Sequence, residues 1–326
     1  MEPLKQTTIV PIQDSSQVAL ARRTANELAS VAGLDEQRRS AVNVVTVELA
    51  NNILQHAGSG QLLFQYIQKT GAFDIIAVDH GPGMVDVERC LEDGFSTKST
   101  PGLGLGAVQR FAIRYGAFSV PERTTVVTAR MAERAPEPDF SVICTAIHGE
   151  TLSGDGWDVS ADGRSFCVVD GLGHGMLAAE AAKVAIEILH KHPGISPAAC
   201  LEKMHAAMRS TRGAAGAVVR VNPETGTLDF AGIGNISCVL MADEKNQSLV
   251  SYNGTLGHQL RRVQEFSYPY KRRDLLLMHS DGLTTQAKLG IPSLLLSQAP
   301  NVIGPFLFSE QLRGRDDATL LVSRLA

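Results

Sequence analysis

The chain has 326 residues, which is about twice the length of a typical domain and so favours two domains over one small module. Hydrophobic residues make up 44% and charged residues 20%, a composition that is ordinary for a globular protein and excludes disorder over most of the chain. The chain has 30 basic and 34 acidic residues, and this net charge of -4 provides no excess of positive charge to attract a phosphate backbone. The composition therefore gives no support for nucleic-acid binding.

Cysteine usage and hydropathy indicate the compartment. The five cysteines are scattered, and none forms a Cys-x-x-Cys pair, which argues against a disulfide framework and a zinc knuckle. No apolar run reaches the ~18 to 20 residues of a membrane span. The first residues also lack the basic start and apolar core of a signal peptide. We therefore expect a soluble, cytoplasmic protein that binds neither membrane nor nucleic acid.

In the first half of the chain, the pattern predicts helices followed by strands. Ser15 or Ser16 caps a helix that ends at Gly33, and Asp35 opens a longer helix that runs to Gly58. The other predicted elements are a hairpin of strands 61–68 and 73–78, a helix over 107–115, and strands over 117–120 and 124–131. Helices followed by strands predict a two-layer α/β sandwich.

The segment 132–139 is the clearest linker, because two prolines and four charged residues separate apolar strands there. A boundary at this segment predicts a first domain of residues 1–135 and a second of residues 140–326.

The second domain is predicted to be rich in strands, with helices packed outside them. Strands over 141–147 and 165–169 precede helices over 176–190 and 197–209, and five or six strands follow, ending with 318–322. Asp158 and Asp162 fall between the first two strands, where we expect a solvated hairpin turn.

Two polar residues lie on one side of the otherwise apolar second helix. Glu48 and Asn52 are four residues apart, so their side chains project from the same face and need polar partners. Asp79 follows an apolar strand, and Gly81 and Gly83 come directly after it. A carboxylate at a strand end, followed by glycines that admit a ligand to the backbone, suits recognition of an adenine amino group.

A glycine-rich stretch, residues 94–106, leads into the predicted helix 107–115. Its backbone amides and the N-terminus of that helix can bind phosphate groups. Taken singly, each of these three features is more typical of an ordinary helix face, turn or loop. It is their order along the chain that indicates a nucleotide site.

This ordered set resembles the GHKL (Bergerat) ATP-binding fold of histidine kinases and gyrase, and within it the RsbT-type serine/threonine kinases of the stressosome. The segments that carry the resemblance are Glu48–Asn52, Asp79–Gly83, Glu92–Thr97 and Thr124–Val127. It implies a domain that transfers phosphate from ATP to serine or threonine of STAS-domain proteins, chemistry that depends mainly on positioning and charge neutralisation.

The resemblance also implies a role for each residue. Asn52 would ligate the Mg²⁺ that bridges the ATP phosphates, Glu48 would orient or deprotonate the attacking hydroxyl, and Asp79 would hold adenine. The glycines that would provide backbone access and a closing lid are Gly81, Gly83, Gly102, Gly104 and Gly106.

Aspartates in the second half lie at strand edges or beside glycines. Asp170 and Asp281 each follow an apolar run and precede a glycine, Asp155 stands between two glycines, and Asp316 and Asp317 come just before the last strand. A carboxylate after a buried apolar run is costly unless a cation meets it. Any one Asp-Gly pair could be a simple turn, but carboxylates converging from several strand ends favour Mg²⁺ or Mn²⁺.

This second set resembles the SpoIIE class of metal-dependent serine/threonine phosphatases, over about residues 141–326. The most specific segments are Asp170–Gly175, Ser280–Gly282 and Arg315–Thr319. The family's first motif is commonly Gly-Gly-Asp followed by an aromatic pair, and Ser153 and Gly156 depart from it.

The resemblance implies an α-β-β-α sandwich with two metal ions. Asp155 and Asp170 would hold the pair, the carbonyl of Gly171 would supply another oxygen, and Asp281 and Asp316 would complete the shell of one ion. Two such ions can generate the hydroxide that attacks a phosphoserine. Asp317 would lie outside the ligand set.

Together, these resemblances predict a bifunctional partner-switching regulator with ATP, Mg²⁺ and Mn²⁺ as cofactors. Its kinase and phosphatase domains would act on the same STAS-domain partners, in a stressosome-like complex. The alternative is that the first domain only binds, either as an anti-sigma factor or as a nucleotide sensor that gates the phosphatase without kinase activity.

Overall fold

The computed structural model describes residues 5–84, 86–87, 104–135, 137–242, 246–284 and 292–326. It divides into two compact units, Met1–Pro136 with Ile291–Glu310, and Glu137–Gly290 with Gln311–Ala326. In the described part of the chain, no helix is both long and apolar enough to cross a membrane.

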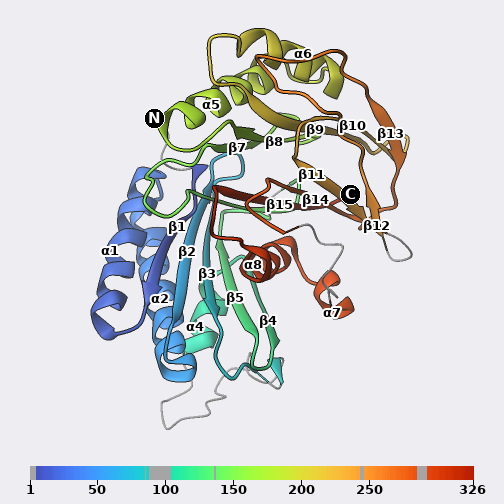
Figure 1. The fold of residues 1–326 in the computed structure, drawn as a ribbon. Helices are drawn as coiled ribbons and strands as arrows, with labels where there is room; N and C mark the ends of the chain where they lie inside the picture. The colour runs from blue at the N-terminus through green and yellow to red at the C-terminus, as the bar shows by residue number, and fades with distance from the viewer. Residues whose placement is uncertain (1–4, 85, 88–103, 136, 243–245, 285–291) are drawn as a thin grey trace. The chain divides into compact units, whose positions relative to one another are not determined.

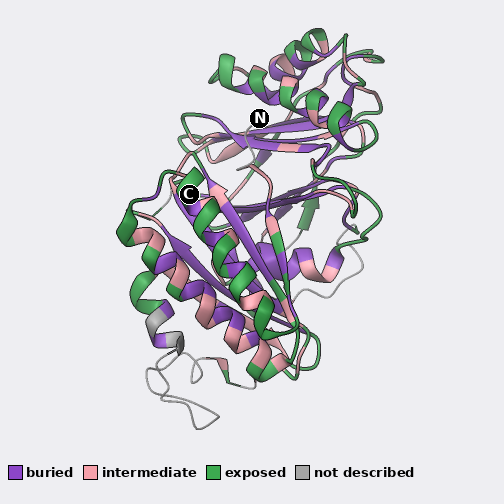
Figure 2. Ribbon diagram, turned by 90° about the vertical axis from the view of Figure 1, so that its left-hand side faces the viewer, coloured by how far each residue is buried: buried purple, intermediate pink, exposed green. Residues whose placement is uncertain are grey.

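The first unit is a five-stranded antiparallel sheet with helices packed on it (Figure 1). The sheet order is β1-β2-β3-β5-β4. The strands are β1 (Thr8–Ile12), β2 (Gly60–Ile67), β3 (Ala72–Asp79), β4 (Arg114–Val120) and β5 (Thr124–Met131). The helices on one face are α1 (Ser15–Val31), α2 (Glu36–Asn52) and α4 (Gly104–Phe111). This is the predicted two-layer arrangement, with the strands mostly buried and the outer sides of α1 and α2 exposed (Figure 2).

The caps of the first two helices follow from their sequences. The prediction that Ser15 or Ser16 caps α1 was wrong, because Asp14 accepts hydrogen bonds from the amides of Ser16 (2.7 Å) and Gln17 (3.3 Å). The Gln17 side chain in turn accepts from the Asp14 amide, which completes a capping box. Asp35 caps α2 as predicted, accepting from the Arg38 amide at 2.8 Å.

The second helix changes its winding where the site residues lie. It was predicted as one helix as far as Gly58, but the α-helix ends at Asn52 and continues as a π-helix, η2 (Ile53–Ala57). Short π-helical turns are frequent at functional sites.

The predicted hairpin of β2 and β3 and the strand β5 are confirmed. The helix predicted over 107–115 lies earlier, at Gly104–Phe111, and Tyr115 belongs to β4 instead. The change comes at Ile113, whose amide already bonds to the carbonyl of Arg130 on β5 (2.9 Å).

Two helices from late in the chain belong to the first unit: α7 (Ser293–Leu296) and α8 (Pro300–Gln311). Thr128 lies between Val127 and Ala129, which face α1 and α2, so its side chain points to the opposite face of the sheet. There the Asn301 amide donates to the Thr128 hydroxyl (3.1 Å), and Phe306 packs edge-on against Phe118 (5.0 Å). The sequence had predicted only strands and turns in this part of the chain, so α8 was missed; the helix contains Pro305, a residue that is unfavourable inside helices.

A buried ion pair ties β3 to β5. Asp74 and Arg130 are cross-strand partners, with side chains 1% and 0% exposed, and the guanidinium donates to both carboxylate oxygens at 2.6 Å. Removing one partner leaves an uncompensated buried charge.

Asp74→Ala should therefore lower the free energy of unfolding of the first unit by about 3–5 kcal/mol. Glu224→Ala, which breaks an exposed arginine pair in the second unit, is the control and should change stability little. Calorimetry measures both, and fluorescence of Trp157, the only tryptophan, reports the second unit alone. Equal losses of stability in the two variants would contradict the large contribution assigned here to the buried ion pair.

The second unit contains two five-stranded antiparallel sheets, in the orders β13-β10-β9-β8-β7 and β12-β11-β14-β15-β6. The first comprises β7 (Asp155–Val159), β8 (Ser165–Gly171), β9 (Ala214–Asn222), β10 (Thr227–Ile233) and β13 (Phe266–Pro269). The second comprises β6 (Phe140–Thr145), β11 (Ser237–Met241), β12 (Asn246–Ser248), β14 (Leu275–His279) and β15 (Ala318–Arg324). Phe140 packs edge-on against Trp157 and Phe166, which joins the two sheets.

Helices α5 (Met176–Lys191) and α6 (Pro197–Ala207) cover the sheet that contains β8 and β9 (Figure 1). Both were predicted from sequence. Strand β7 was not, and the expectation that Asp158 lies in a solvated turn was wrong. Asp158 lies within β7, is buried, and bonds to the His190 ring at 2.6 Å.

Candidate functional site

Glu48 and Asn52 occupy the last turns of α2, where both are half-buried. The side-chain nitrogen Nδ2 of Asn52 is buried and has no hydrogen-bond partner among the described residues. An unpaired buried amide is costly, so this position suits a polar ligand.

Asp79 ends β3 on the side of the sheet that faces α2. Its side chain points the same way as Ile75 and Ala77, because side chains alternate along a strand, and these two residues pack against the helices. The carboxylate accepts a hydrogen bond from the Gly81 amide (3.0 Å), and burial raises the pKa of Asp79. Asp79 and Asn52 are thus placed at the same helix-facing side of the first unit.

Thr125 is a candidate that sequence reasoning did not assign. It is the direct cross-strand partner of Asp79, is buried, and has its hydroxyl 2.8 Å from that of Ser119. The available signal was its position in the segment Thr124–Val127, which carries the resemblance to the kinases.

The glycines after Asp79 have packing reasons of their own. A Cβ at Gly81 would lie 2.6 Å from the Cβ of Ala57, and one at Gly83 would lie 2.8 Å from the Cα of Pro121. Gly104 and Gly106 fall in the first turn of α4, whereas Gly102 lies outside the described residues. The described part of the first unit thus presents a carboxylate, an unpaired amide N–H donor and a helix start, which fit the adenine and the phosphates of a nucleotide. A Mg²⁺ ion would need the side-chain oxygen of Asn52 instead.

In the second unit, strand register brings two aspartates together. Asp155 and Asp170 are directly opposite each other in the β7–β8 pair. Directly opposite residues have Cβ atoms about 4.5–5.5 Å apart, so two like charges there are destabilising without a cation. Asp155 is buried, and its Oδ2 accepts from the Ser280 hydroxyl (2.6 Å), while its Oδ1 is buried without a partner among the described residues.

The other sheet contributes the remaining aspartates. Asp281 follows β14, and Asp316 and Asp317 precede β15, the neighbouring antiparallel strand, so all three lie at one end of that pair. Asp281 accepts from the Asn235 amide at 2.7 Å. Asp317 instead accepts from the backbone amides of Ile147 (2.7 Å) and Gly154 (2.6 Å). Asp317 therefore fixes the segment that leads into Asp155.

Gly171 must be glycine at the end of β8. A Cβ there would lie 2.3 Å from the carbonyl oxygen of Ala178 on α5, and its amide bonds to the carbonyl of Gly154 at 3.0 Å. The close approach of α5 thus holds the backbone that carries the Gly171 carbonyl next to Asp170.

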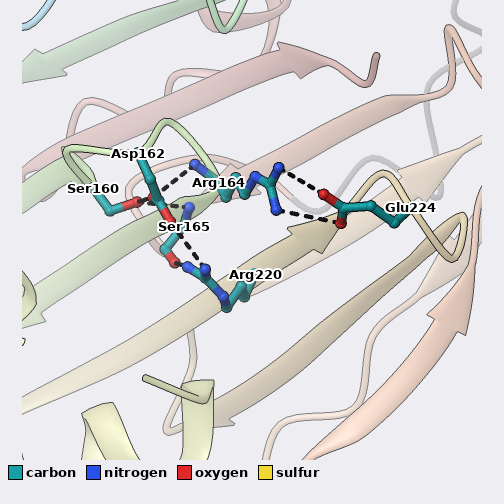
Figure 3. A network of polar contacts seen from close by, with 6 residues as sticks. All are labelled: Ser160, Asp162, Arg164, Ser165, Arg220 and Glu224. Carbon is teal, nitrogen blue, oxygen red and sulfur yellow. Dashed lines mark hydrogen bonds and ion pairs between the residues drawn. The ribbon is translucent and has the colours of Figure 1, made fainter. Parts of the chain in front are cut away.

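A network of polar side chains holds the turn between β7 and β8, and this turn sets the register that places Asp155 opposite Asp170 (Figure 3). Arg220 donates to Asp162 and to Ser165, each at 2.9 Å, and the Ser160 hydroxyl also donates to Asp162. Although burial acts to raise it, hydrogen bonds from Ser160, the Arg164 amide and Arg220 lower the pKa of Asp162 to about 2. Asp162 lies in the turn as predicted, but it anchors β7 to β8 there.

The acidic cluster is electrostatically strained without a cation. Burial first, and then neighbouring carboxylates, raise the pKa of Asp155 to about 7 and that of Asp170 to about 8. Asp281 and Asp316 both contribute to the shift at Asp170. In the described residues, no three His, Cys, Asp or Glu side chains form a ready-made ligand set, so cation binding requires them to turn. The oxygen-only donors and the unpaired Asp155 oxygen fit Mg²⁺ or Mn²⁺.

These raised pKa values predict how the metal-free protein responds to pH. A carboxyl whose pKa is higher in the folded than in the unfolded state makes the folded protein bind more protons, so stability falls as pH rises. In EDTA, the melting temperature should therefore fall between about pH 5 and pH 8, and Mn²⁺ should reverse the fall. Asp170→Asn should flatten the dependence. A wild-type melting temperature that rises over this range with the same slope as Asp170→Asn would contradict the account.

Sequence comparison agrees with this division of the chain. Models of stage II sporulation protein E (SpoIIE) and of the histidine kinase-like ATPase domain match residues 160–326 and 13–131 respectively. The chain therefore belongs to the SpoIIE family and carries a histidine kinase-like ATPase domain ahead of the SpoIIE domain.

Two individual relatives are each similar to part of the chain. The chain is 30% identical over 128 residues to the serine/threonine-protein kinase RsbT of Bacillus subtilis (strain 168), covering 39% of this chain and 96% of RsbT. It is 23% identical over 138 residues to the phosphoserine phosphatase RsbX of the same organism, covering 41% of this chain and 69% of RsbX. A solved chain from a study of the bacterial stressosome is similar with a TM-score of 0.52 and 26% identity, over 57% of this chain and 98% of that chain.

Proposed function

We propose that this chain is a bifunctional partner-switching regulator. One half phosphorylates serine or threonine on STAS-domain partner proteins with ATP, and the other half removes the phosphate in a metal-dependent hydrolysis. Similarity to RsbT and to RsbX, in two halves of one chain, supports the pairing of activities. Fusion would keep both activities at high effective concentration around one partner.

The β7–β8 register carries the phosphatase half of the proposal. Two carboxylates directly opposite each other, Asp155 buried and Asp170 half-buried, have little structural value of their own, because they repel. Asp155 and Asp170 would hold two divalent cations, with the Gly171 carbonyl, Asp281 and Asp316 as further oxygen donors. When bound, such a pair supplies an activated water and neutralises charge on the phosphate. Ser280 orients Asp155, and Asp317 orients the chain before it.

In the kinase half, the residues mainly position their ligands. Asp79 would accept a hydrogen bond from adenine, and Asn52 would hold the Mg²⁺ of the nucleotide. Glu48, one turn before Asn52 on the same face of α2, would orient the attacking hydroxyl. Gly81, Gly83, Gly102, Gly104 and Gly106 would border the nucleotide.

The proposal is tested with the full chain and purified STAS-domain proteins from the same organism. With γ-labelled ATP and Mg²⁺, label should appear on serine or threonine of one of them. With the phosphorylated partner and Mn²⁺, phosphate should be released, and EDTA should stop the release. A stable complex with no transfer in the first assay would favour the binding-module alternative, and failure of the second would remove the phosphatase assignment.

A second candidate is that the first unit senses nucleotide and gates the phosphatase. The observation in its favour is helix α8, which the chain inserts between Asp281 and Asp316 but which packs in the first unit. Glu310, near its end, pairs with Arg123 and accepts from the Thr124 hydroxyl. Thr124 in turn lies 3.2 Å from the His80 ring, next to Asp79.

The next residues continue directly to the acidic cluster. The Gln311 carbonyl accepts from the Thr284 amide (3.0 Å), and the Arg313 amide donates to the Gly282 carbonyl (2.9 Å). The chain therefore links the adenine-side strand end, through Glu310, to the segments that carry Asp281 and Asp316. A change at the nucleotide pocket could be transmitted along this link if Glu310 has two arrangements.

Glu310→Gln tests this second candidate. If the link operates, ADP or ATP changes the Mn²⁺ dependence of phosphate release by the wild type, and the change is lost in Glu310→Gln. Glu133→Gln removes an exposed ion-pair partner of Arg38 in the same unit and should keep the nucleotide effect. Identical nucleotide effects in wild type and Glu310→Gln, or none in the wild type, would reject the gating function.

A further inference from the structure

A surface cavity of about 350 Å³ borders the loop between β8 and α5. Its lining includes Glu150, His174, Met176, Leu177 and Arg212. None of these residues belongs to the proposed metal ligands.

The cavity adjoins the acidic cluster through the backbone. The loop begins directly after Asp170 and Gly171, and the Leu172 amide donates to the carbonyl of Gly213 (3.0 Å), next to Arg212. A Cβ at Gly154, the residue before Asp155, would lie 3.3 Å from the carbonyl oxygen of Gly173. A ligand in the cavity would thus be next to the metal-binding carboxylates.

Arg212 gives the cavity a cation that can meet an anion. Its guanidinium lies over Gly173, since a Cβ there would be 3.0 Å from Nη1. Within the described residues, no side-chain hydrogen bond or ion pair joins Arg212 to another group, whereas Glu150 is engaged by the His174 ring at 2.7 Å. An arginine in this situation is suited to bind a phosphate through its several N–H donors.

The rim of the cavity is apolar and exposed. Met176 and Leu177, which line the cavity, are 71% and 47% exposed, and Leu172, four residues before Met176, is 46% exposed. Met176 and Leu177 begin helix α5, which packs against the protein through other residues, such as the fully buried Ala178 and Ala181. Neighbouring exposed apolar side chains beside a binding site indicate a surface for a protein partner.

We infer that this cavity and its rim bind the phosphoserine segment of the substrate protein, with Arg212 on the phosphate and Met176 and Leu177 on apolar side chains that flank it. The inference rests on the proposed phosphatase function. It adds that the preferred substrates carry apolar residues beside the phosphoserine. Charge complementarity and continuity with the acidic cluster favour a phosphorylated segment over a second copy of this chain, which offers no phosphate.

The test uses the full chain with Mn²⁺ and two synthetic peptides, one with phosphoserine flanked by leucines and one with those leucines replaced by serines. The wild type should hydrolyse the leucine peptide with a kcat/KM about tenfold higher, the order of a few apolar contacts at an interface. In Met176→Ser/Leu177→Ser the ratio of the two kcat/KM values should fall to about one, with the serine peptide as internal reference. Val250→Ser, which changes a side chain 52% exposed that does not line the cavity, should keep the preference.

Arg212 is tested separately, because it acts on the phosphate. Arg212→Ala should raise the KM of both peptides and the inhibition constant of inorganic phosphate about tenfold, and Arg212→Lys should restore part of the loss. Arg262→Ala is the control for an exposed arginine elsewhere in the unit.

The outcomes separate this inference from the function on which it rests. If the wild type hydrolyses both peptides equally well, or if the rim and Arg212 variants behave like their controls, the inference is overturned and the phosphatase stands. A rim variant that changes only the oligomeric state would assign the rim to a second copy, and would also overturn it. If neither peptide loses phosphate with Mn²⁺, the proposed phosphatase fails, and the inference with it.

Discussion

Asp170→Ala is expected to lower phosphatase activity by a factor on the order of 10³ at any practical Mn²⁺ concentration, as removal of a main stabiliser of a transition state does. Asp170 lies directly opposite Asp155, and its pKa responds to Asp155, Asp281 and Asp316 together. Under the proposed two-metal arrangement Asp170 would be shared between the ions, so its loss should affect both of them.

Asp316→Ala is the matched comparison. Asp316 precedes β15 of the second sheet and would complete the shell of one ion only, so excess Mn²⁺ should recover part of the activity of this variant. Melting experiments test the same point. Mn²⁺ should raise the melting temperature of the wild type strongly and that of Asp170→Ala much less. Equal recovery of the two variants by Mn²⁺ would show that Asp170 is not shared between the ions.

Asn52→Ala and Asp79→Asn are expected to remove kinase activity while dephosphorylation continues. Asp79→Asn replaces the buried acceptor at the end of β3, and loss of a hydrogen bond to a charged group weakens binding by about 10- to 100-fold. Asn52→Ala should weaken ATP binding only when Mg²⁺ is present, because it removes a metal ligand instead of an adenine contact.

Isothermal titration with and without Mg²⁺ distinguishes the two losses. Asp79→Asn should bind ATP poorly in both conditions, and Asn52→Ala should bind it like the wild type in EDTA. Phosphate transfer at the wild-type rate in either variant would contradict the assignment of the pocket.

Much of the first unit could be predicted because its signals are local. The β2–β3 hairpin and β5 follow from apolar runs and turn residues, and Asp35 caps α2 where the sequence indicates. The cap of α1 was misplaced by one or two residues because Asp14 competes better for the first amides than the serines after it.

What could not be predicted depends on contacts distant in sequence. Asp155 and Asp170 were each expected at the metal site, but their pairing depends on the register of β7, a strand of five residues that the pattern did not reveal. The packing of α8 in the first unit is likewise a tertiary contact, made by Asn301 and Phe306 in a segment with an internal proline. Arg212 lies outside any motif that the sequence singled out. Thr125 lies inside the segment Thr124–Val127, but the sequence assigned it no role, and only the fold places it beside Asp79 and places Arg212 beside Gly173.

The central claim is that one chain carries two opposed activities on the same partner. Its most direct test is the steady-state phosphorylation of a STAS-domain partner incubated with ATP, Mg²⁺ and Mn²⁺ and with wild type, Asp170→Ala or Asn52→Ala. The account predicts that phosphorylated partner accumulates to a higher level with Asp170→Ala than with wild type, and does not form with Asn52→Ala. Equal levels with Asp170→Ala and wild type, or phosphorylation by Asn52→Ala, would contradict it.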